Sequence, residues 1–143
     1  MNFAKPILFT GMVLAAGMAH SQSGMNLGSV LDQGGKKLSS DEVKATLTGA
    51  STSYPRGSGT VTVAFRNDGS IQARFVNPDV RTSGNGTWKM EENGKYCMTL
   101  NWNAGYLTSF SGCFHVFKAG DKFFIATSET DRNAAADERV YEK

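Results

Sequence analysis

Two strand–turn–strand patterns constrain the fold of this chain more than any other feature of its sequence. In the first, apolar and polar residues alternate over residues 60–65 and again over 71–75, on either side of an Asn-Asp-Gly sequence. A three-residue loop with Gly69 in the left-handed conformation pairs Phe65 with Ile71. A two-residue turn would instead put the apolar side chains of the second strand on the wrong face. The sequence therefore predicts a hairpin with a three-residue loop.

The second pattern covers residues 84–102, which read GNGTWKMEENGKYCMTLNW. With Glu-Asn-Gly at 92–94 as the loop, the two strands place apolar residues opposite each other on one face and opposite charges on the other. The resulting pairs are Met90 with Tyr96, Trp88 with Met98, and Glu91 with Lys95. In this register the apolar face builds a core, while Cys97 lies on the opposite face.

The two cysteines, Cys97 and Cys113, lie symmetrically about Gly105 in a turn-like stretch. A symmetric hairpin places them opposite each other, so we predict a disulfide. It closes a loop of about 16 residues, which corresponds to a stabilisation of about 3 kcal/mol. The competing interpretations are a Cys113 nucleophile assisted by His115, and a zinc site. Neither is favoured, because an exported thiol enzyme is rare and no usual ligand spacing is present.

A short helix is predicted over residues 40–48. Ser39 and Glu42 form a capping box, and Gly49 can end the helix in a left-handed conformation. Val43 and Leu47 share one face, and a helix this short must pack against something to be stable. It is the only spare amphipathic element, so we expect it to cover the cysteine side of the sheet.

A last hairpin is predicted over residues 109–126, with its turn at 119–121. Both of its faces are apolar. Phe114 and Val116 continue the face of Tyr96, whereas Phe117 and either Phe123 or Phe124 lie on the cysteine side. In the charged tail, 127–143, the alanines at 134–136 could begin a weak helix, or residues 139–141 could add an edge strand.

The N-terminal residues 1–21 have the pattern of a signal peptide. Lys5 precedes an apolar run over 7–19, which is shorter than the roughly 20 residues that span a bilayer. Cleavage after Ala19 and cleavage after Ser21 both fit. Residues 22–37, rich in Gly, Ser, Gln and Asn, are predicted to be a flexible lead-in, and 38–143 a single β-rich domain. The expected location is the periplasm or outside the cell.

The composition fits one domain and argues against nucleic-acid binding. The chain has 143 residues, 40% of them hydrophobic, and a formal net charge of +2 with basic and acidic residues interspersed. Neither a G-x-S-x-G elbow nor a phosphate-binding loop occurs in the sequence. The sequence predicts no catalytic residues, no metal site and no cofactor. The expected fold is mainly β: a single antiparallel meander sheet or a small barrel of six to eight strands, lipocalin-like or related, with one short N-terminal helix.

Several short sequences together resemble an uncharacterised family. They are LSSDEVKATLTG, DGSI, GTW, GKYC and CFHVFKAGDKFF, between about residues 38 and 125. This set is similar to a domain of unknown function found in small exported proteobacterial proteins. The resemblance implies a signal peptide and a compact β-rich domain with a Trp and Cys signature, here on Trp88, Cys97 and Cys113. It implies no known activity.

Two functional hypotheses follow from the sequence. The first is a non-enzymatic exported envelope protein that acts by binding, as an inhibitor or immunity factor for an exported enzyme or toxin. The second is a carrier of a small apolar ligand inside a barrel, although an ordinary core would use the same aromatic residues. The candidate binding surface or pocket consists of Tyr54, Trp88, Tyr96, Trp102, Tyr106 and Phe110, and in the carrier Met98 and Phe114 also line the pocket. A ligand-sized interior usually needs about eight strands.

Overall fold

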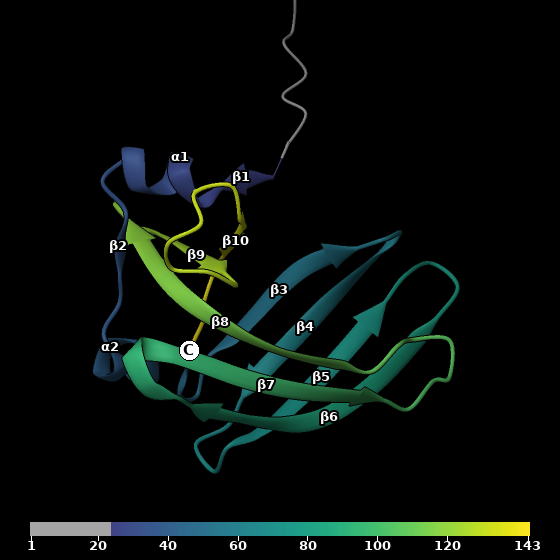
Figure 1. Ribbon diagram of the computed structural model, residues 1–143. Coiled ribbons are helices and arrows are strands. Elements are labelled where there is room, and N and C mark those ends of the chain that lie inside the picture. Colours follow the sequence, from purple (N-terminus) through teal and green to yellow (C-terminus); the bar gives the residue numbers. More distant parts are fainter. Residues whose placement is uncertain (1–23) are drawn as a thin grey trace, which may run out of the picture.

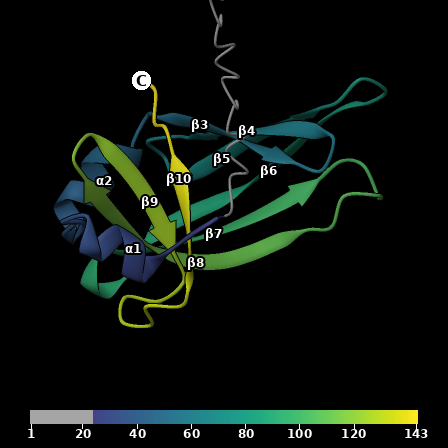
Figure 2. The same ribbon diagram turned by 90° about the horizontal axis from the view of Figure 1, so that it is seen from above.

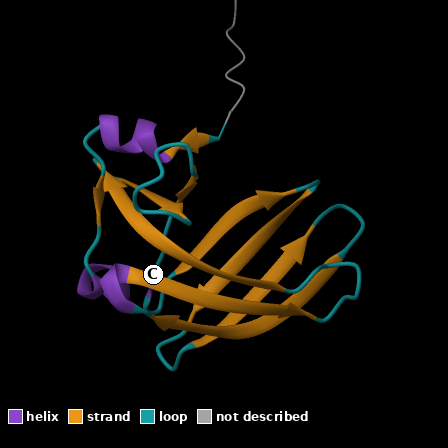
Figure 3. Ribbon diagram, in the orientation of Figure 1, coloured by secondary structure: helices purple, strands orange, loops and turns teal. Residues whose placement is uncertain are grey.

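The computed structural model describes residues 24–143, which form one antiparallel sheet and two short α-helices (Figures 1 and 3). The helices are α1 (Leu27–Asp32) and α2 (Ser40–Leu47), with a 3₁₀ turn η1 (Glu92–Gly94). The strands are β1 (Met25–Asn26), β2 (Lys36–Lys37), β3 (Ser51–Arg56), β4 (Gly59–Phe65), β5 (Ser70–Val76), β6 (Arg81–Met90), β7 (Lys95–Trp102), β8 (Phe110–Ala119), β9 (Lys122–Ala126) and β10 (Ala135–Arg139). The signal-peptide prediction falls on residues outside this range.

The sheet is a meander that curls into a half-barrel. Nine of its ten strands follow the order β1-β10-β9-β8-β7-β6-β5-β4-β3, and the tenth, β2, pairs with β8 beside this path. The curvature makes β3 and β4 face β7 and β8 across the interior (Figure 2). The prediction of a mainly β antiparallel meander is confirmed. The predicted count of six to eight strands was wrong, because short strands at both ends of the domain extend the sheet. The prediction of a single helix was also wrong, because a second helix, α1, precedes the expected one.

Both predicted hairpin registers are confirmed. Phe65 pairs with Ile71, and Gly69 has a φ of 83° in the intervening loop. In the second hairpin, Trp88 pairs with Met98 and Met90 with Tyr96. In each hairpin, the alternation of apolar and polar residues and the length of the turn were sufficient to predict the register. A shift by one residue would expose every core side chain of a strand.

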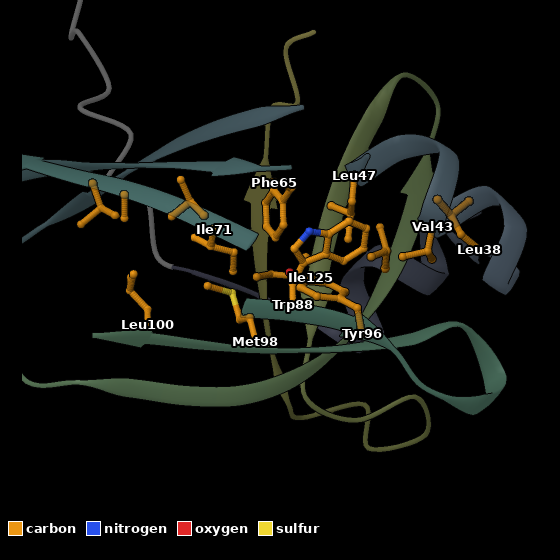
Figure 4. Packing of buried hydrophobic residues seen from close by; sticks show 14 of the residues in the cluster. Leu38, Val43, Leu47, Phe65, Ile71, Trp88, Tyr96, Met98, Leu100 and Ile125 are labelled. Atoms are coloured by element: carbon orange, nitrogen blue, oxygen red, sulfur yellow. The ribbon is translucent and has the colours of Figure 1, made fainter. Parts of the chain in front are cut away.

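Helix α2 closes one end of the half-barrel. Its capping box is formed as predicted, with the Ser39 backbone N–H donating to Glu42 at 2.8 Å. Val43 and Leu47 are fully buried in the main core, where they lie close to Trp88 (Figure 4). The expectation that this helix covers the cysteine side was wrong. Val43 and Leu47 instead pack into the main core at the end of the half-barrel, where burial of their apolar surface stabilises the helix.

Helix α1 covers the convex face instead. Leu27 and Val30 are fully buried against Phe117 and Phe124 in a second core cluster. Residues 24–37 are therefore an integral part of the fold, and the expected flexible lead-in was wrong. The segment is mostly polar, but it contains two apolar residues, Leu27 and Val30, at a helical spacing. They follow an N-cap residue, Asn26, whose side chain accepts a hydrogen bond from the Ser29 backbone N–H at 2.8 Å.

The C-terminal segment completes the sheet. The strand β10 begins at Ala135 and pairs with β9, so the alanines start a strand and not a helix. Residues 139–141 do not form a separate edge strand: Arg139 ends β10, and a single bridge between Ser51 and Glu142 follows it. Phe124, and not Phe123, lies on the cysteine side opposite Phe117.

The predicted disulfide is present between Cys97 and Cys113, which are paired residues of β7 and β8. Disulfides persist in oxidising, extracytoplasmic compartments, so this bond points to such a location. Within residues 24–143, the structure has no helix of the length and hydrophobicity needed to cross a membrane.

Candidate functional site

A cavity of about 480 Å³ lies inside the half-barrel and opens between β3, β10 and the β7–β8 loop. Its volume falls within the roughly 300–1,000 Å³ range of small-molecule sites. The floor and walls are formed by Val63, Phe65, Tyr96, Met98, Leu100, Phe110, Phe114 and Ile125, and the more polar rim by Thr52, Tyr54, Arg56, Thr108, Ser109, Asp137, Arg139 and Tyr141. Because α2 closes the opposite end, the cavity has a deep apolar part and an open, more polar mouth.

A row of aromatic rings follows the cavity from its mouth to the deep end. Phe110 stacks on Phe114 with centroids 5.9 Å apart, and Phe114 lies 5.7 Å from Tyr96. Tyr96 in turn contacts Phe65 edge-on at 6.0 Å. Phe110 is 39% exposed at the mouth, whereas Phe65 and Tyr96 are buried. The row thus presents a continuous apolar surface to any molecule that enters.

The mouth lies where β3 approaches β10 and the segment after it without forming a continuous strand pair, so the barrel stays open there. We call this line of approach the seam. The backbones of β3 and the segment after β10 hydrogen-bond at Ser51 and Glu142, with N···O distances of 2.7 and 2.9 Å. Past this bridge the two edges are joined by side chains. The Arg139 guanidinium lies over the Tyr54 ring, 4.4 Å from its centroid. The side chains at the seam therefore decide what can pass between the two edges.

The positive charge of Arg139 lies in a partly apolar environment at the seam. The Arg139 side chain is only 14% exposed, and its carboxylate neighbour, Asp137, is 3.7 Å away and 57% exposed. Burial raises the pKa of Tyr141 to about 12, although the Arg139 charge opposes the shift. Burial also raises the pKa of Tyr54 and, more strongly, of Tyr96. All three phenols therefore keep their protons at neutral pH and can donate hydrogen bonds.

The comparison with protein families gives one match, to the family described as "Protein of unknown function (DUF995)", over residues 9–135. The chain belongs to the DUF995 family. The resemblance to a domain of unknown function is thereby confirmed, and the match extends it toward both ends of the chain. No curated protein and no solved structure matches this DUF995 protein.

The predicted binding residues of this DUF995 protein are only partly brought together. Tyr54, Tyr96 and Phe110 line the cavity, as do Met98 and Phe114. The two tryptophans do not line it. Trp88 is buried in the core with its indole N–H donating to the Arg66 carbonyl at 3.0 Å, and Trp102 is a half-buried residue packed against that core. Tyr106 is 61% exposed in the β7–β8 loop and does not line the cavity.

The residues that sequence reasoning missed lie in the C-terminal segment. Asp137, Arg139 and Tyr141 all line the cavity, and they alternate along the chain as residues on one face of a strand do. That spacing was a signal available in the sequence. It was overlooked because a strand whose inward face carries charge looks like a solvated tail until its position over the cavity is known.

Thr52, on β3, is a further cavity residue that the sequence did not single out. It is 5% exposed, and its hydroxyl has no hydrogen-bond partner within residues 24–143. A ligand with a polar group near this side of the cavity could form a hydrogen bond with this hydroxyl.

The residues considered for thiol or zinc chemistry lie on the convex face, away from the cavity. Cys113 is bonded to Cys97, so it is not a free nucleophile here. His115 is 7% exposed beside the Lys37–Glu129 ion pair. Among residues 24–143, no group of three or more His, Cys, Asp or Glu side chains is placed to hold a metal ion.

Acidification through the titration range of His115 is expected to destabilise the protein. Burial, reinforced by the charges of Lys37 and Lys95, lowers the pKa of His115 below its ordinary 6.5, and Glu129 only partly opposes this. The unfolded chain therefore binds the proton at a higher pH than the folded chain does. The free energy of unfolding should decrease as the pH falls below about 6.5, and urea unfolding at several pH values measures it.

The control is His115→Gln, which removes the titrating group and keeps a side chain of moderate size. Its free energy of unfolding should depend less on pH between about 7 and 5 than that of the unmodified protein. An identical pH dependence in both proteins would mean that His115 does not carry the effect.

Proposed function

We propose that this DUF995 protein acts by binding a small molecule with a substantial apolar part in the cavity of its half-barrel. The observation that carries the proposal is the open, aromatic-lined cavity of about 480 Å³ beside the buried core of the half-barrel. Buried apolar walls with a few polar groups at one side are typical of small-molecule sites. The carrier hypothesis assumed a closed barrel, and here the open seam provides the entrance.

Two further features support ligand binding over simple packing. Leaving Phe110 and Phe114 beside an empty space forgoes contacts that a well-packed core would make. The unpartnered Thr52 hydroxyl is a second feature that a bound molecule would satisfy. Both features lie on the cavity surface, so a single ligand could account for both.

A neutral fluorescent probe tests the proposal. N-phenyl-1-naphthylamine becomes bright in apolar surroundings, and we expect saturable binding of one probe per protein. Thr108→Trp places a large ring at the mouth, where the native side chain is exposed. This substitution should weaken probe binding about tenfold, which corresponds to about 1.4 kcal/mol.

Thr60→Trp is the matched control. Thr60 is exposed and alternates with the core residues of β4, so its side chain lies on the outside of the half-barrel. Probe binding should be unchanged in this variant. If the unmodified protein takes up no probe in a saturable way, or if both tryptophan variants weaken binding equally, the proposed cavity function is wrong.

A protein partner is a second candidate, favoured by the loop beside the mouth. Tyr106 is 61% exposed and Phe110 39% exposed, and together they place two aromatic rings near the rim. Aromatic residues are enriched where proteins bind each other. The test is a pull-down from envelope and culture fractions with the unmodified protein and with Tyr106→Ser. Loss of one captured enzyme or toxin in the variant would support an inhibitor or immunity factor, and equal capture would contradict it.

For either function we propose that the protein works in the periplasm or outside the cell. The disulfide and the signal-like sequence at residues 1–21 support this location. Fractionation of cells that produce the full chain, followed by mass measurement of the purified protein, tests both the location and the cleavage position.

A further inference from the structure

We propose that the cavity selects a single-chain amphiphile with an anionic oxygen head group, and that Arg139 and Tyr141 bind this head group at the seam. The inference rests on the proposed ligand-binding function and adds the chemical class of the ligand.

Arg139 is placed as a ligand-binding arginine would be. Its side chain lines an apolar cavity and is only 14% exposed, a position that is costly for a charge without a close counterion. The nearest carboxylate in the described part of the chain, Asp137, is 3.7 Å away and 57% exposed, so solvent weakens this pair. The protein therefore neutralises the charge of Arg139 only in part, and a bound anion would complete the neutralisation.

The stacking of Arg139 orients its donors. The guanidinium lies over the ring of Tyr54, 4.4 Å from its centroid, and Nη1 donates to the carbonyl of Glu138 at 2.9 Å. A stacked guanidinium still donates in its own plane, and it has five N–H groups in a fork that matches a carboxylate or phosphate. Donors therefore remain available after the contacts with Tyr54 and Glu138 are made.

Tyr141 supplies a second donor on the same side. It follows Arg139 by two residues and, like it, lines the cavity. Its ring lies edge-on to Phe123 with centroids 5.6 Å apart, which holds it in place. Because its hydroxyl stays protonated at neutral pH, it can donate to an anionic oxygen next to the arginine.

The apolar remainder of the ligand is defined by what adjoins this polar group. The rings of Phe110, Phe114 and Tyr96 lead from the mouth, where Arg139 lies, along the cavity to its deep end. A shielded cation at one side of a largely apolar cavity, with Arg56 and the more exposed Asp137 at the rim, fits a molecule with one anionic end and one apolar chain. A fully apolar molecule would leave Arg139 desolvated and unpaired, and a polyanion would find only one inward arginine that is well shielded.

The test displaces N-phenyl-1-naphthylamine with four molecules that share a sixteen-carbon chain. They are hexadecanoate, monohexadecyl phosphate, hexadecanol and hexadecyltrimethylammonium, measured below their aggregation concentrations at about pH 8. We expect the two anions to bind at least about tenfold more tightly than the alcohol, and the cation to bind most weakly. The ranking of carboxylate against phosphate then identifies the head group.

Arg139→Gln should remove the preference for the anions and leave hexadecanol binding within about twofold, and retained alcohol binding also shows that the variant is folded. Arg139→Lys keeps the charge without the fork and should bind the anions with intermediate affinity. Arg74→Gln, at an exposed position on the outer face of β5 and away from the cavity, is the matched control and should keep the preference. If Arg139→Gln does not fold, Tyr141→Phe replaces it and should weaken anion binding alone.

Equal affinity for hexadecanoate and hexadecanol in the unmodified protein would overturn the inference and leave the proposed function intact. So would an anion preference that survives Arg139→Gln or disappears in Arg74→Gln. Failure of all four molecules and of the neutral probe to bind would instead contradict the proposed function itself. The two failures are thus distinguishable in one set of titrations.

Discussion

Gly86→Ala should lower the free energy of unfolding by about 3 kcal/mol or more, because the added methyl group has no space beside the neighbouring backbone. A Cβ at this position would lie 1.8 Å from the backbone carbonyl oxygen of Thr99 on the paired strand β7. No real Cβ contact is this short. The clash is with backbone, so it cannot be relieved by a side-chain rotation, and the strands must separate where the sheet curls.

Urea unfolding monitored by tryptophan fluorescence measures this effect, because Trp88 is buried two residues away on the same strand. Gly105→Ala is the matched control. A Cβ there meets nothing within 4 Å, so the change should stay within about 0.5 kcal/mol. If the two alanine variants are equally stable, the close approach of β6 and β7 at Gly86 is not a requirement of the fold.

Removal of the disulfide should also cost about 3 kcal/mol. Cys97 and Cys113 are separated by 16 residues, and the bond restricts the unfolded chain over that loop. The double variant Cys97→Ser, Cys113→Ser should therefore unfold at a clearly lower urea concentration than the unmodified protein. The lost stability acts largely on the unfolded state, so the folded variant should keep its circular dichroism spectrum.

Two comparisons separate the disulfide from the substitutions themselves. Adding a reductant should destabilise the unmodified protein by a similar amount and leave the double variant unchanged. Ser111→Ala alters another exposed residue of β8, opposite Thr99, and should have little effect. A double variant as stable as the unmodified protein would show that the β7–β8 pairing needs no covalent support.

Local features of the sequence predicted local structure well. The capping box at Ser39 and Glu42 formed the expected helix, and the loop containing Gly69 set the expected register. The symmetric spacing of Cys97 and Cys113 also predicted their pairing. Each of these rests on interactions between residues that are close in the chain or joined by one hairpin, so the pattern contains nearly all of the relevant information.

The surfaces that cover the sheet were harder to predict. Both faces of the last hairpin are apolar, and the sequence offered one obvious helix to cover them. In the structure, α2 closes the end of the half-barrel and α1, within a segment that appeared to be a linker, covers Phe117 and Phe124. Which apolar surface a short helix buries depends on the curvature of the sheet, and no local pattern encodes that curvature.

By itself, the sequence determined the β meander, its two central registers, the capped helix and the cystine. It also determined which residues are large and apolar, but not which of them meet an empty space. Only the tertiary structure decided that Tyr96 and Phe114 line a cavity while Trp88 is packed in the core, and that Arg139 lies over Tyr54 at an unclosed seam. The reason is that the cavity and the seam are defined by contacts between β3 and the C-terminal segment, which are far apart along the chain. Such contacts depend on the accumulated twist of all the strands between them.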